Sequence, residues 1–272
     1  MTEAVKIGIF DSGLGGLSVL REIRKQMPAQ PVLYLGDQFH VPYGVRPMEE
    51  ILQFSRTITR YLLAQGAQLI VVACNTASAA ALRTLRQEFP QVPFVGMEPA
   101  VKPAAEQTRT GVVGVLATYA TFQGALYASV VERFAQGVTL LTSPCPGLVP
   151  QIEAGNLAGA ETRRILKQEL DPMLAQGIDT VVLGCTHYPF VIPLIKEIVG
   201  PEVRVIDPAP AVARQVAHLL QEHGWLASGP ATDEVLLLTT GEAAALQQLL
   251  PALLPEKLPV AHISWHGDQL KA

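Results

Sequence analysis

Two stretches of this chain share one pattern: a short apolar run ends at a cysteine, and small polar residues follow. Residues 71–73 lead to Cys74 in the first stretch, and residues 181–184 lead to Cys185 in the second. The same four residues, Leu-Ala-Gln-Gly, precede both copies, and the two cysteines are 111 residues apart. A repeat that preserves a buried strand, its approach and its last residue predicts a chain built from two related halves.

The repeat extends well beyond the cysteines. The apolar run at residues 6–10 recurs at residues 111–116, and residues 98–100 recur as residues 207–209. In both halves short apolar runs alternate with helical patterns, which is typical of parallel βαβ units. We therefore predict an α/β fold with two pseudo-symmetric domains, each with a central, mainly parallel sheet flanked by helices.

The chain after Asp207 does not begin a third copy. Its pattern predicts a helix over residues 211–224, a strand over 235–238, a helix over 242–253 and a short strand over 260–264. We expect this tail to complete the first domain, and prolines at both crossings suit a boundary. The predicted domains are residues 1–98 with 210–272, and residues 99–209.

Composition, charge and the length of the apolar runs indicate which kinds of protein this chain can be. The 272 residues are 49% hydrophobic and 16% charged with a net charge of -4, so the chain is globular and nucleic acid or an anionic membrane is not an expected partner. No apolar run approaches the roughly 18 residues of a membrane span. The N-terminal apolar run ends at Asp11, too short for a signal-peptide core. We expect a cytoplasmic protein whose three cysteines are free thiols.

Polar residues at the ends of the expected strands are the candidates for a site. Ligands of open α/β sheets bind beyond the carboxyl ends of strands, so we expect the site in the cleft between the two domains. The polar residues at or just past such ends are Asp11, Asp37, Cys74, Glu98, Thr118, Cys145, Cys185 and Asp207.

Each candidate also has a plainer interpretation. Cys74 alone could be a buried structural thiol, but the matching Cys185 argues for chemistry. Cys145 has no counterpart in the first half and is expected to be incidental. Asp11 could cap the turn into the first helix or orient a thiol, and His187 could cap a turn or tune Cys185.

The other histidines lack such a context, and we expect surface or packing roles for His40, His218, His223, His262 and His266. Their spacing does not suit zinc, so no metal is expected. The glycine-rich segment 13–18 fits a dinucleotide fingerprint poorly, although Asp37 stands where a ribose-binding acid would. The plainer interpretation is that its glycines let a ligand carboxylate approach the backbone and the helix N-terminus.

Two chemistries suit a cysteine pair from opposite halves. A redox disulfide is disfavoured because redox pairs usually lie close in sequence. Proton transfer at a carbon centre needs one thiolate to remove a proton and the opposite thiol to deliver one to the other face. A thiol pKa near 8.5 allows either role after modest tuning. Such a reaction is nearly symmetric, which would account for the repeat.

Four segments together resemble the motif set of glutamate racemase, in the cofactor-independent aspartate/glutamate racemase family. They are residues 9–16, residues 36–44, residues 73–78 and residues 184–189. The resemblance covers nearly the whole chain. It implies interconversion of L- and D-glutamate without a cofactor or metal. The D-glutamate would supply peptidoglycan synthesis, and hence the cell wall and cell shape. The resemblance also implies a homodimer. Some members carry an N-terminal extension tied to activation by a peptidoglycan precursor; the first strand begins near Val5, so we do not expect it here.

The resemblance also implies roles for individual residues. Cys74 and Cys185 would be the two acid/bases, with Asp11 assisting the first thiol and His187 and Glu153 the second. Substrate would be bound by Asp11, Ser12, Tyr43, Gly44, Asn75, Thr76, Thr118, Thr121, Thr186 and His187. Three alternatives stay open: a thiol oxidoreductase, a two-domain binding protein that does not turn glutamate over, and a racemase acting on aspartate or a hydantoin.

Overall fold

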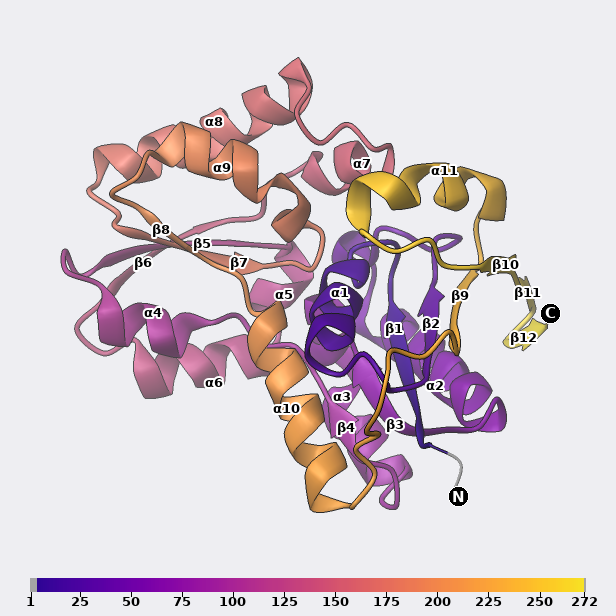
Figure 1. The fold of residues 1–272 in the computed structure, drawn as a ribbon. Helices are drawn as coiled ribbons and strands as arrows, with labels where there is room; N and C mark the ends of the chain where they lie inside the picture. The colour runs from indigo at the N-terminus through magenta and orange to yellow at the C-terminus, as the bar shows by residue number, and fades with distance from the viewer. Residues whose placement is uncertain (1–3, 272) are drawn as a thin grey trace.

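Two parallel sheets carry the fold, as the repeat predicts (Figure 1). The computed structural model describes residues 4–271, so residues 1–3 of the N-terminal segment discussed above, and residue 272, lie outside it. The larger sheet has the order β10-β9-β2-β1-β3-β4 and the smaller sheet the order β6-β5-β7-β8. The strands are β1 (Lys6–Asp11), β2 (Val32–Gly36), β3 (Ala67–Val72), β4 (Phe94–Val95), β5 (Val112–Ala117), β6 (Thr139–Ser143), β7 (Thr180–Gly184), β8 (Arg204–Ile206), β9 (Val235–Thr239) and β10 (Val260–His262).

The internal repeat is visible in the order of the strands. The run β2-β1-β3-β4 of the larger sheet has the same order as β6-β5-β7-β8 of the smaller one, and all of these pairs are parallel. Strands β3 and β7, which lead to the two cysteines, occupy equivalent places. Strand β9 pairs with β2, so the tail of the chain extends the larger sheet, as expected. The fold class is confirmed: a two-domain α/β arrangement with parallel sheets flanked by helices.

Helices cover both sheets. They are α1 (Leu17–Gln26), α2 (Met48–Ala64), α3 (Asn75–Glu88), α4 (Val101–Gln107), α5 (Tyr119–Gln123), α6 (Ala125–Phe134), α7 (Leu148–Glu153), α8 (Ala160–Ala175), α9 (Ile192–Val199), α10 (Ala209–Glu222) and α11 (Ala243–Leu253), with 3-10 turns η1 (Tyr43–Val45) and η2 (Tyr188–Val191). Between residues 4 and 271, no helix combines the length and apolar character needed to cross a membrane.

Local contacts set the boundaries of several elements. Helix α3 begins at Asn75, because the Cys74 sulfur caps it by accepting a hydrogen bond from the Ala77 N–H at 3.4 Å. The expected strand over residues 260–264 stops at His262. After it β11 (Ser264–His266) pairs antiparallel with β12 (Gln269–Lys271), a hairpin that the sequence pattern does not predict.

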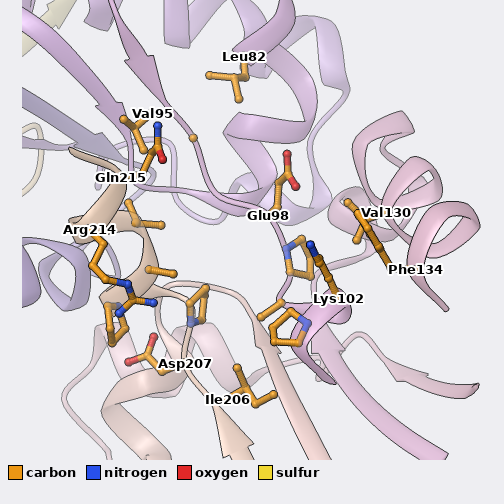
Figure 2. A pocket seen from close by; sticks show the side chains of 18 of the residues that line it. Leu82, Val95, Glu98, Lys102, Val130, Phe134, Ile206, Asp207, Arg214 and Gln215 are labelled. Atoms are coloured by element: carbon orange, nitrogen blue, oxygen red, sulfur yellow. The ribbon is translucent and has the colours of Figure 1, made fainter. Parts of the chain in front are cut away.

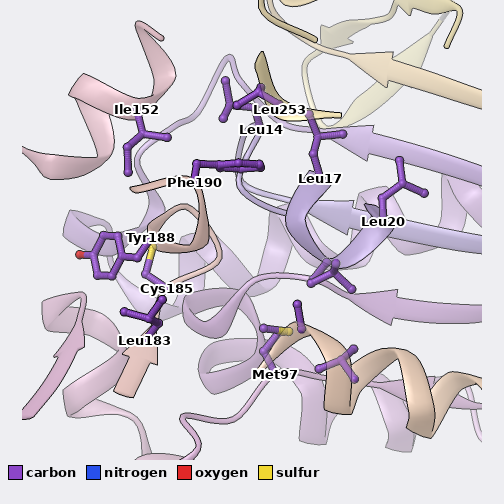
Figure 3. Close-up of a cluster of buried hydrophobic side chains, with 14 of the residues drawn as sticks. Leu14, Leu17, Leu20, Met97, Ile152, Leu183, Cys185, Tyr188, Phe190 and Leu253 are labelled. Carbon is purple, nitrogen blue, oxygen red and sulfur yellow. The ribbon is translucent and has the colours of Figure 1, made fainter. Parts of the chain in front are cut away.

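One hydrophobic cluster joins the two domains (Figure 3). Leu14 and Leu17 of the first domain and Ile152 and Phe190 of the second are at most 8% exposed and belong to the same cluster. Cys185 belongs to it too, so its thiol lies at the border between an apolar core and the polar cleft. This packing holds the carboxyl ends of β3 and β7 toward each other.

Candidate active site

The two cysteines of the repeat line the same cavity. Cys74 directly follows β3 and Cys185 directly follows β7, and they are 4% and 6% exposed. The cavity between them is narrow, at about 20 Å³. Its described lining consists of Ser12, Pro42, Tyr43, Gly44, Cys74, Asn75, Thr76, Thr118, Val149, Cys185, Thr186 and His187. Most of the residues singled out from the sequence therefore meet at one place.

Cys74 stands at the N-terminus of α3 with two polar neighbours. Its sulfur accepts the Ala77 N–H and lies 3.8 Å from the hydroxyl of Ser12, to which the thiol can donate. Burial raises the pKa of the Cys74 thiol, and the negative charge of Asp11 raises it further. In this arrangement Cys74 holds its proton.

Asp11 is fully buried at the end of β1, and of the two roles considered for it the structure shows the cap, while its action on a thiol stays a prediction. Its Oδ2 accepts the N–H groups of Gly13 and Gly16 at 3.2 and 2.9 Å, so it does cap the glycine turn. Its Oδ1 accepts the Thr186 hydroxyl at 3.2 Å, which reaches it from the second domain. Burial raises the pKa of Asp11, opposed by the nearby His187 and by the Gly16 N–H. Asp11 is not part of the described lining of the cavity, but its partner Thr186 is.

His187 connects the second thiol to a carboxylate. Its Nδ1 lies 3.7 Å from the Cys185 sulfur, and its Nε2 lies 2.5 Å from Glu153 Oε1. Burial lowers the pKa of His187, but its hydrogen bonds to Cys185 and Glu153 outweigh burial and hold that pKa well above the ordinary value. Burial raises the pKa of Glu153, but the bond to His187 outweighs it and the pKa is lowered. A cationic donor therefore stands beside Cys185.

Glu153 also ties the two domains together. Its Oε1 accepts the Leu14 N–H at 2.8 Å, and its Oε2 accepts the Gln38 amide at 2.9 Å. The Oε1 of Gln38 in turn accepts the Thr239 hydroxyl at 2.7 Å. Gln38 was missed in the sequence, because nothing local marks it as the partner of a residue 115 positions away.

The glycine turn is occupied by protein side chains rather than open to a ligand. A Cβ on Gly13 would lie 2.1 Å from the Glu153 carboxylate, and one on Gly15 would lie 2.4 Å from the His187 ring. The amides of the turn are taken by Asp11 and Glu153. In this arrangement of the two domains the glycines make room for the second domain, and the expectation that the turn receives a ligand carboxylate stays a prediction.

Three threonine hydroxyl groups, one from the first domain and two from the second, meet in the cleft. The Thr76 hydroxyl lies 2.9 Å from that of Thr118 and 3.4 Å from that of Thr121. Asn75 is only 2% exposed, and neither atom of its amide has a hydrogen-bond partner among the described residues. Buried amides are nearly always satisfied, so this amide is available to a ligand in the cavity that it lines.

Asp37 does not have the role considered for it. It is fully buried and its carboxylate accepts four donors, so it cannot serve a ribose. His40 packs as expected, with its ring stacked on Phe54, and its Nδ1 also lies 2.9 Å from Asp37. Cys145 stands apart after β6, with its sulfur 3.5 Å from the Ser143 hydroxyl.

A larger cavity lies elsewhere, along the two segments that join the domains (Figure 2). Its volume is about 910 Å³, and its walls include Glu98, Lys102, Asp207 and Arg214. Its described lining contains neither a cysteine nor a histidine, so proton transfer by a thiol does not belong there. No group of three or more metal-binding side chains occurs between residues 4 and 271.

A family comparison agrees with this geometry. A sequence model of the Asp/Glu/Hydantoin racemases matches residues 7–216. The chain belongs to this family. The matched residues include both strands that lead to a cysteine and every described residue that lines the cavity between the two cysteines.

Relatives within the family carry a more specific name. A glutamate racemase of Ectopseudomonas mendocina is 52% identical over 254 residues, which cover 93% of this chain and 96% of the relative. The crystal structure of a glutamate racemase isoform from Bacillus anthracis superposes with a TM-score of 0.87 at 32% identity, covering 99% and 100% of the two chains. One from Francisella tularensis, in complex with D-glutamate, superposes with a TM-score of 0.83 at 26% identity, covering 97% and 98%.

Proposed function

We propose that this chain is a glutamate racemase that interconverts L- and D-glutamate by proton transfer between Cys74 and Cys185. The observation that carries the proposal is the pair of buried thiols at equivalent strand ends, on opposite walls of one cavity. Relatives named glutamate racemase, and a neighbour with D-glutamate bound, support the choice of substrate. The reaction needs no redox partner, since no electrons leave the substrate.

The proton transfer has two halves. One sulfur, as thiolate, takes the α-proton, so an S–H bond forms and the electron pair stays on the α-carbon. The opposite thiol then gives its proton to the other face of that carbon, so a C–H bond forms and a thiolate is left. Cys74 and Cys185 exchange roles when the reaction runs in reverse. Each enantiomer is therefore handled by a different thiol first.

The neighbours of the thiols act as positioning and charge-balancing groups in this scheme. His187, held protonated by Glu153, stabilises negative charge on Cys185. Asp11 stands by Cys74 and, with a pKa raised by burial, accepts the Cys74 proton more readily than an exposed carboxylate would.

Polar groups around the cavity are proposed to hold the substrate. Asn75, whose buried amide has no hydrogen-bond partner among residues 4–271, is the strongest of them. Ser12, Thr76, Thr118 and Thr186 line the same space. The remaining contributors are Asp11, Tyr43, Gly44, Thr121 and His187. Because the cavity measures only about 20 Å³, glutamate enters after the two domains separate.

The wider assignment rests on the family resemblance and on sheet membership. The domains are residues 1–98 with 210–272, and residues 99–209, which follows the two sheets. The enzyme works in the cytoplasm as a homodimer, without a cofactor, and supplies D-glutamate for peptidoglycan and so for cell-wall growth and cell shape. Sedimentation at several concentrations tests the dimer: a purely monomeric chain refutes that part.

The decisive experiment uses single cysteine variants. Cys74→Ser and Cys185→Ser should each reduce racemisation by more than about a thousandfold, while Cys145→Ser, the matched control, should keep it. Circular dichroism of each glutamate enantiomer follows the optical signal to zero. In D2O, product should carry deuterium at the α-carbon. Full activity in either site variant, absent deuterium, or turnover of aspartate or a hydantoin in preference to glutamate would refute the proposal.

A further inference from the structure

Asp37 is a buried carboxylate that the reaction scheme does not use. It follows β2, its side chain is 0% exposed, and its N–H donates to the Asp11 carbonyl at 2.9 Å. Burying an ionised carboxylate is costly unless donors surround it. Asp37 stands at the carboxyl end of a central strand, one strand away from Asp11. The donors around its carboxylate indicate which segments of the chain it holds in place.

Four donors from two distant parts of the chain meet on this carboxylate. On Oδ2 it accepts the Tyr43 hydroxyl at 2.6 Å and contacts His40 Nδ1 at 2.9 Å. On Oδ1 it accepts the Thr240 hydroxyl at 2.8 Å and the Trp265 indole N–H at 2.7 Å. One oxygen thus holds the loop after β2, and the other holds the tail of the chain.

Aromatic packing makes the assembly rigid. The His40 ring stacks on Phe54 at a centroid distance of 3.8 Å, and Trp265 approaches the same His40 ring edge-on at 5.0 Å. Phe54 also packs against Tyr43, with centroids 5.7 Å apart. The Tyr43 ring is therefore fixed by packing along its face and by a charge-assisted hydrogen bond at its tip.

Tyr43 and Gly44 form part of the cavity wall opposite the threonines. Because the Tyr43 hydroxyl is bound to Asp37, it is not free to bind a ligand, and the residue serves the wall through its backbone position. The backbone at Gly44 lies too close to the second domain to accept a side chain, since a Cβ there would lie 2.7 Å from Thr118 across the cleft. A shift of the loop would alter the shape of the substrate site.

We propose that Asp37 is a positioning residue of the glutamate site, which fixes the Tyr43–Gly44 wall through the Tyr43 hydroxyl and is itself anchored by Trp265 of the C-terminal hairpin. The inference rests on the proposed function. It predicts an effect on substrate binding rather than on proton transfer. Among the described hydrogen bonds, Asp37 reaches the residues around the thiols through Tyr43 and through the backbone of Asp11, and Trp265 reaches them through Asp37. The hairpin, with no chemistry of its own, would then set the affinity for glutamate.

The test compares three conservative variants with a matched control. Trp265→Phe removes one donor and keeps an aromatic ring, Tyr43→Phe removes only the hydroxyl, and Asp37→Asn removes the charge. Each should raise KM for both glutamate enantiomers by about three- to tenfold and change kcat by less than about twofold. Trp225→Phe, whose ring packs on His223 away from the site, should match the wild type.

A double variant separates positioning from general stability. If Asp37 acts through the Tyr43 hydroxyl, the Asp37→Asn/Tyr43→Phe protein should have a KM within about twofold of the worse single variant. Thermal unfolding is recorded in parallel, since a merely structural role would lower the melting temperature and leave KM of the folded protein unchanged. Unchanged KM in Tyr43→Phe and Trp265→Phe, or fully multiplicative effects in the double variant, would overturn the inference.

Calorimetric binding of D-glutamate keeps the inference separate from the proposed function. A wild type that binds glutamate but does not racemise it refutes the function alone, and the same variants should then weaken binding by the same factor. A wild type that racemises glutamate while all three variants retain its KM refutes the inference alone. A wild type that neither binds nor converts glutamate overturns both.

Discussion

Replacing Glu153 by glutamine removes one charge from the buried pair with His187 and keeps the size of the side chain. The two groups are 2.5 Å apart, with exposures of 12% for Glu153 and 2% for His187. Burial lowers the pKa of His187, yet its bonds to Cys185 and Glu153 raise it well above 6.5, so the imidazole is protonated at neutral pH. Without the carboxylate, the buried cation keeps Cys185 but loses the partner that lies 2.5 Å away.

The expected cost follows from this geometry. Removing one partner of a buried ion pair costs about 3–5 kcal/mol. Glutamine can still accept a hydrogen bond from His187 or Leu14, so we expect about 3 kcal/mol. With a urea m-value of about 3 kcal/mol/M, the unfolding midpoint should fall by about 1 M.

The cost should depend on pH in a defined direction. Because the folded-state pKa of His187 is raised, its stabilising contribution is complete below 6.5 and is lost as the pH rises through the folded value. The pKa of Glu153 is lowered, so its contribution is present above 4.5 and is lost only as the pH falls through its folded value. The difference between wild type and variant should therefore be largest at about pH 6 and shrink at about pH 10.

Urea unfolding of the reduced protein, followed by far-ultraviolet circular dichroism at both pH values, measures this difference. Glu161→Gln is the matched control, because it removes an exposed carboxylate paired with Arg164 and should leave the midpoint unchanged. A Glu153→Gln midpoint that equals the wild type at about pH 6, or that is shifted equally at both pH values, would refute the reasoning.

Three further substitutions test other parts of the site and fold. Asn75→Leu removes a buried amide that has no partner in the described part of the chain, so it should leave the melting temperature equal or higher while raising KM at least about tenfold; a less stable protein with unchanged KM would contradict this. Gly15→Ala would place a Cβ 2.4 Å from His187 Nδ1, so kcat should fall at least about tenfold with the circular dichroism spectrum retained, and wild-type kcat would contradict it. Burial raises the pKa of Asp179, but bonds from Arg109 and its neighbours hold it at about 2, so its contribution is present above 3.8 and lost toward about 2. Asp179→Asn should cost about 2 kcal/mol in urea unfolding near neutral pH and progressively less on acidification, whereas a constant cost would argue against the ion as its source.

What the sequence predicted well is what neighbouring residues determine. The strand before each cysteine, the α/β alternation and the return of the tail all followed from periodicity and repetition. The helix predicted over residues 242–253 is α11, Ala243–Leu253, because its apolar residues recur at helical spacing. The candidates that met at the cavity were found because parallel strands present their carboxyl ends at one edge.

What the sequence could not predict depends on partners far away in the chain. Gln38 became relevant only through Glu153, 115 positions on, and Asp37 only through Trp265, 228 positions on. The sequence does not show that Glu153 and His187 fill the space above the glycine turn. The closing hairpin was missed because strands of three residues leave no usable periodicity.

The return of the chain to its first sheet has a consequence for the order of folding during synthesis. Strand β9 must pair with β2, and the carboxylate beside β2 waits for a threonine 203 positions later and an indole 228 positions later. Domains tend to fold from the N-terminus as the chain emerges, at about 5–20 residues per second. The loop bearing Tyr43 therefore spends about 10–45 s beside an uncovered sheet edge and an incompletely paired buried carboxylate. Nascent chains of this protein should be most open to chaperones and proteases during that interval, and least so once residue 265 has emerged.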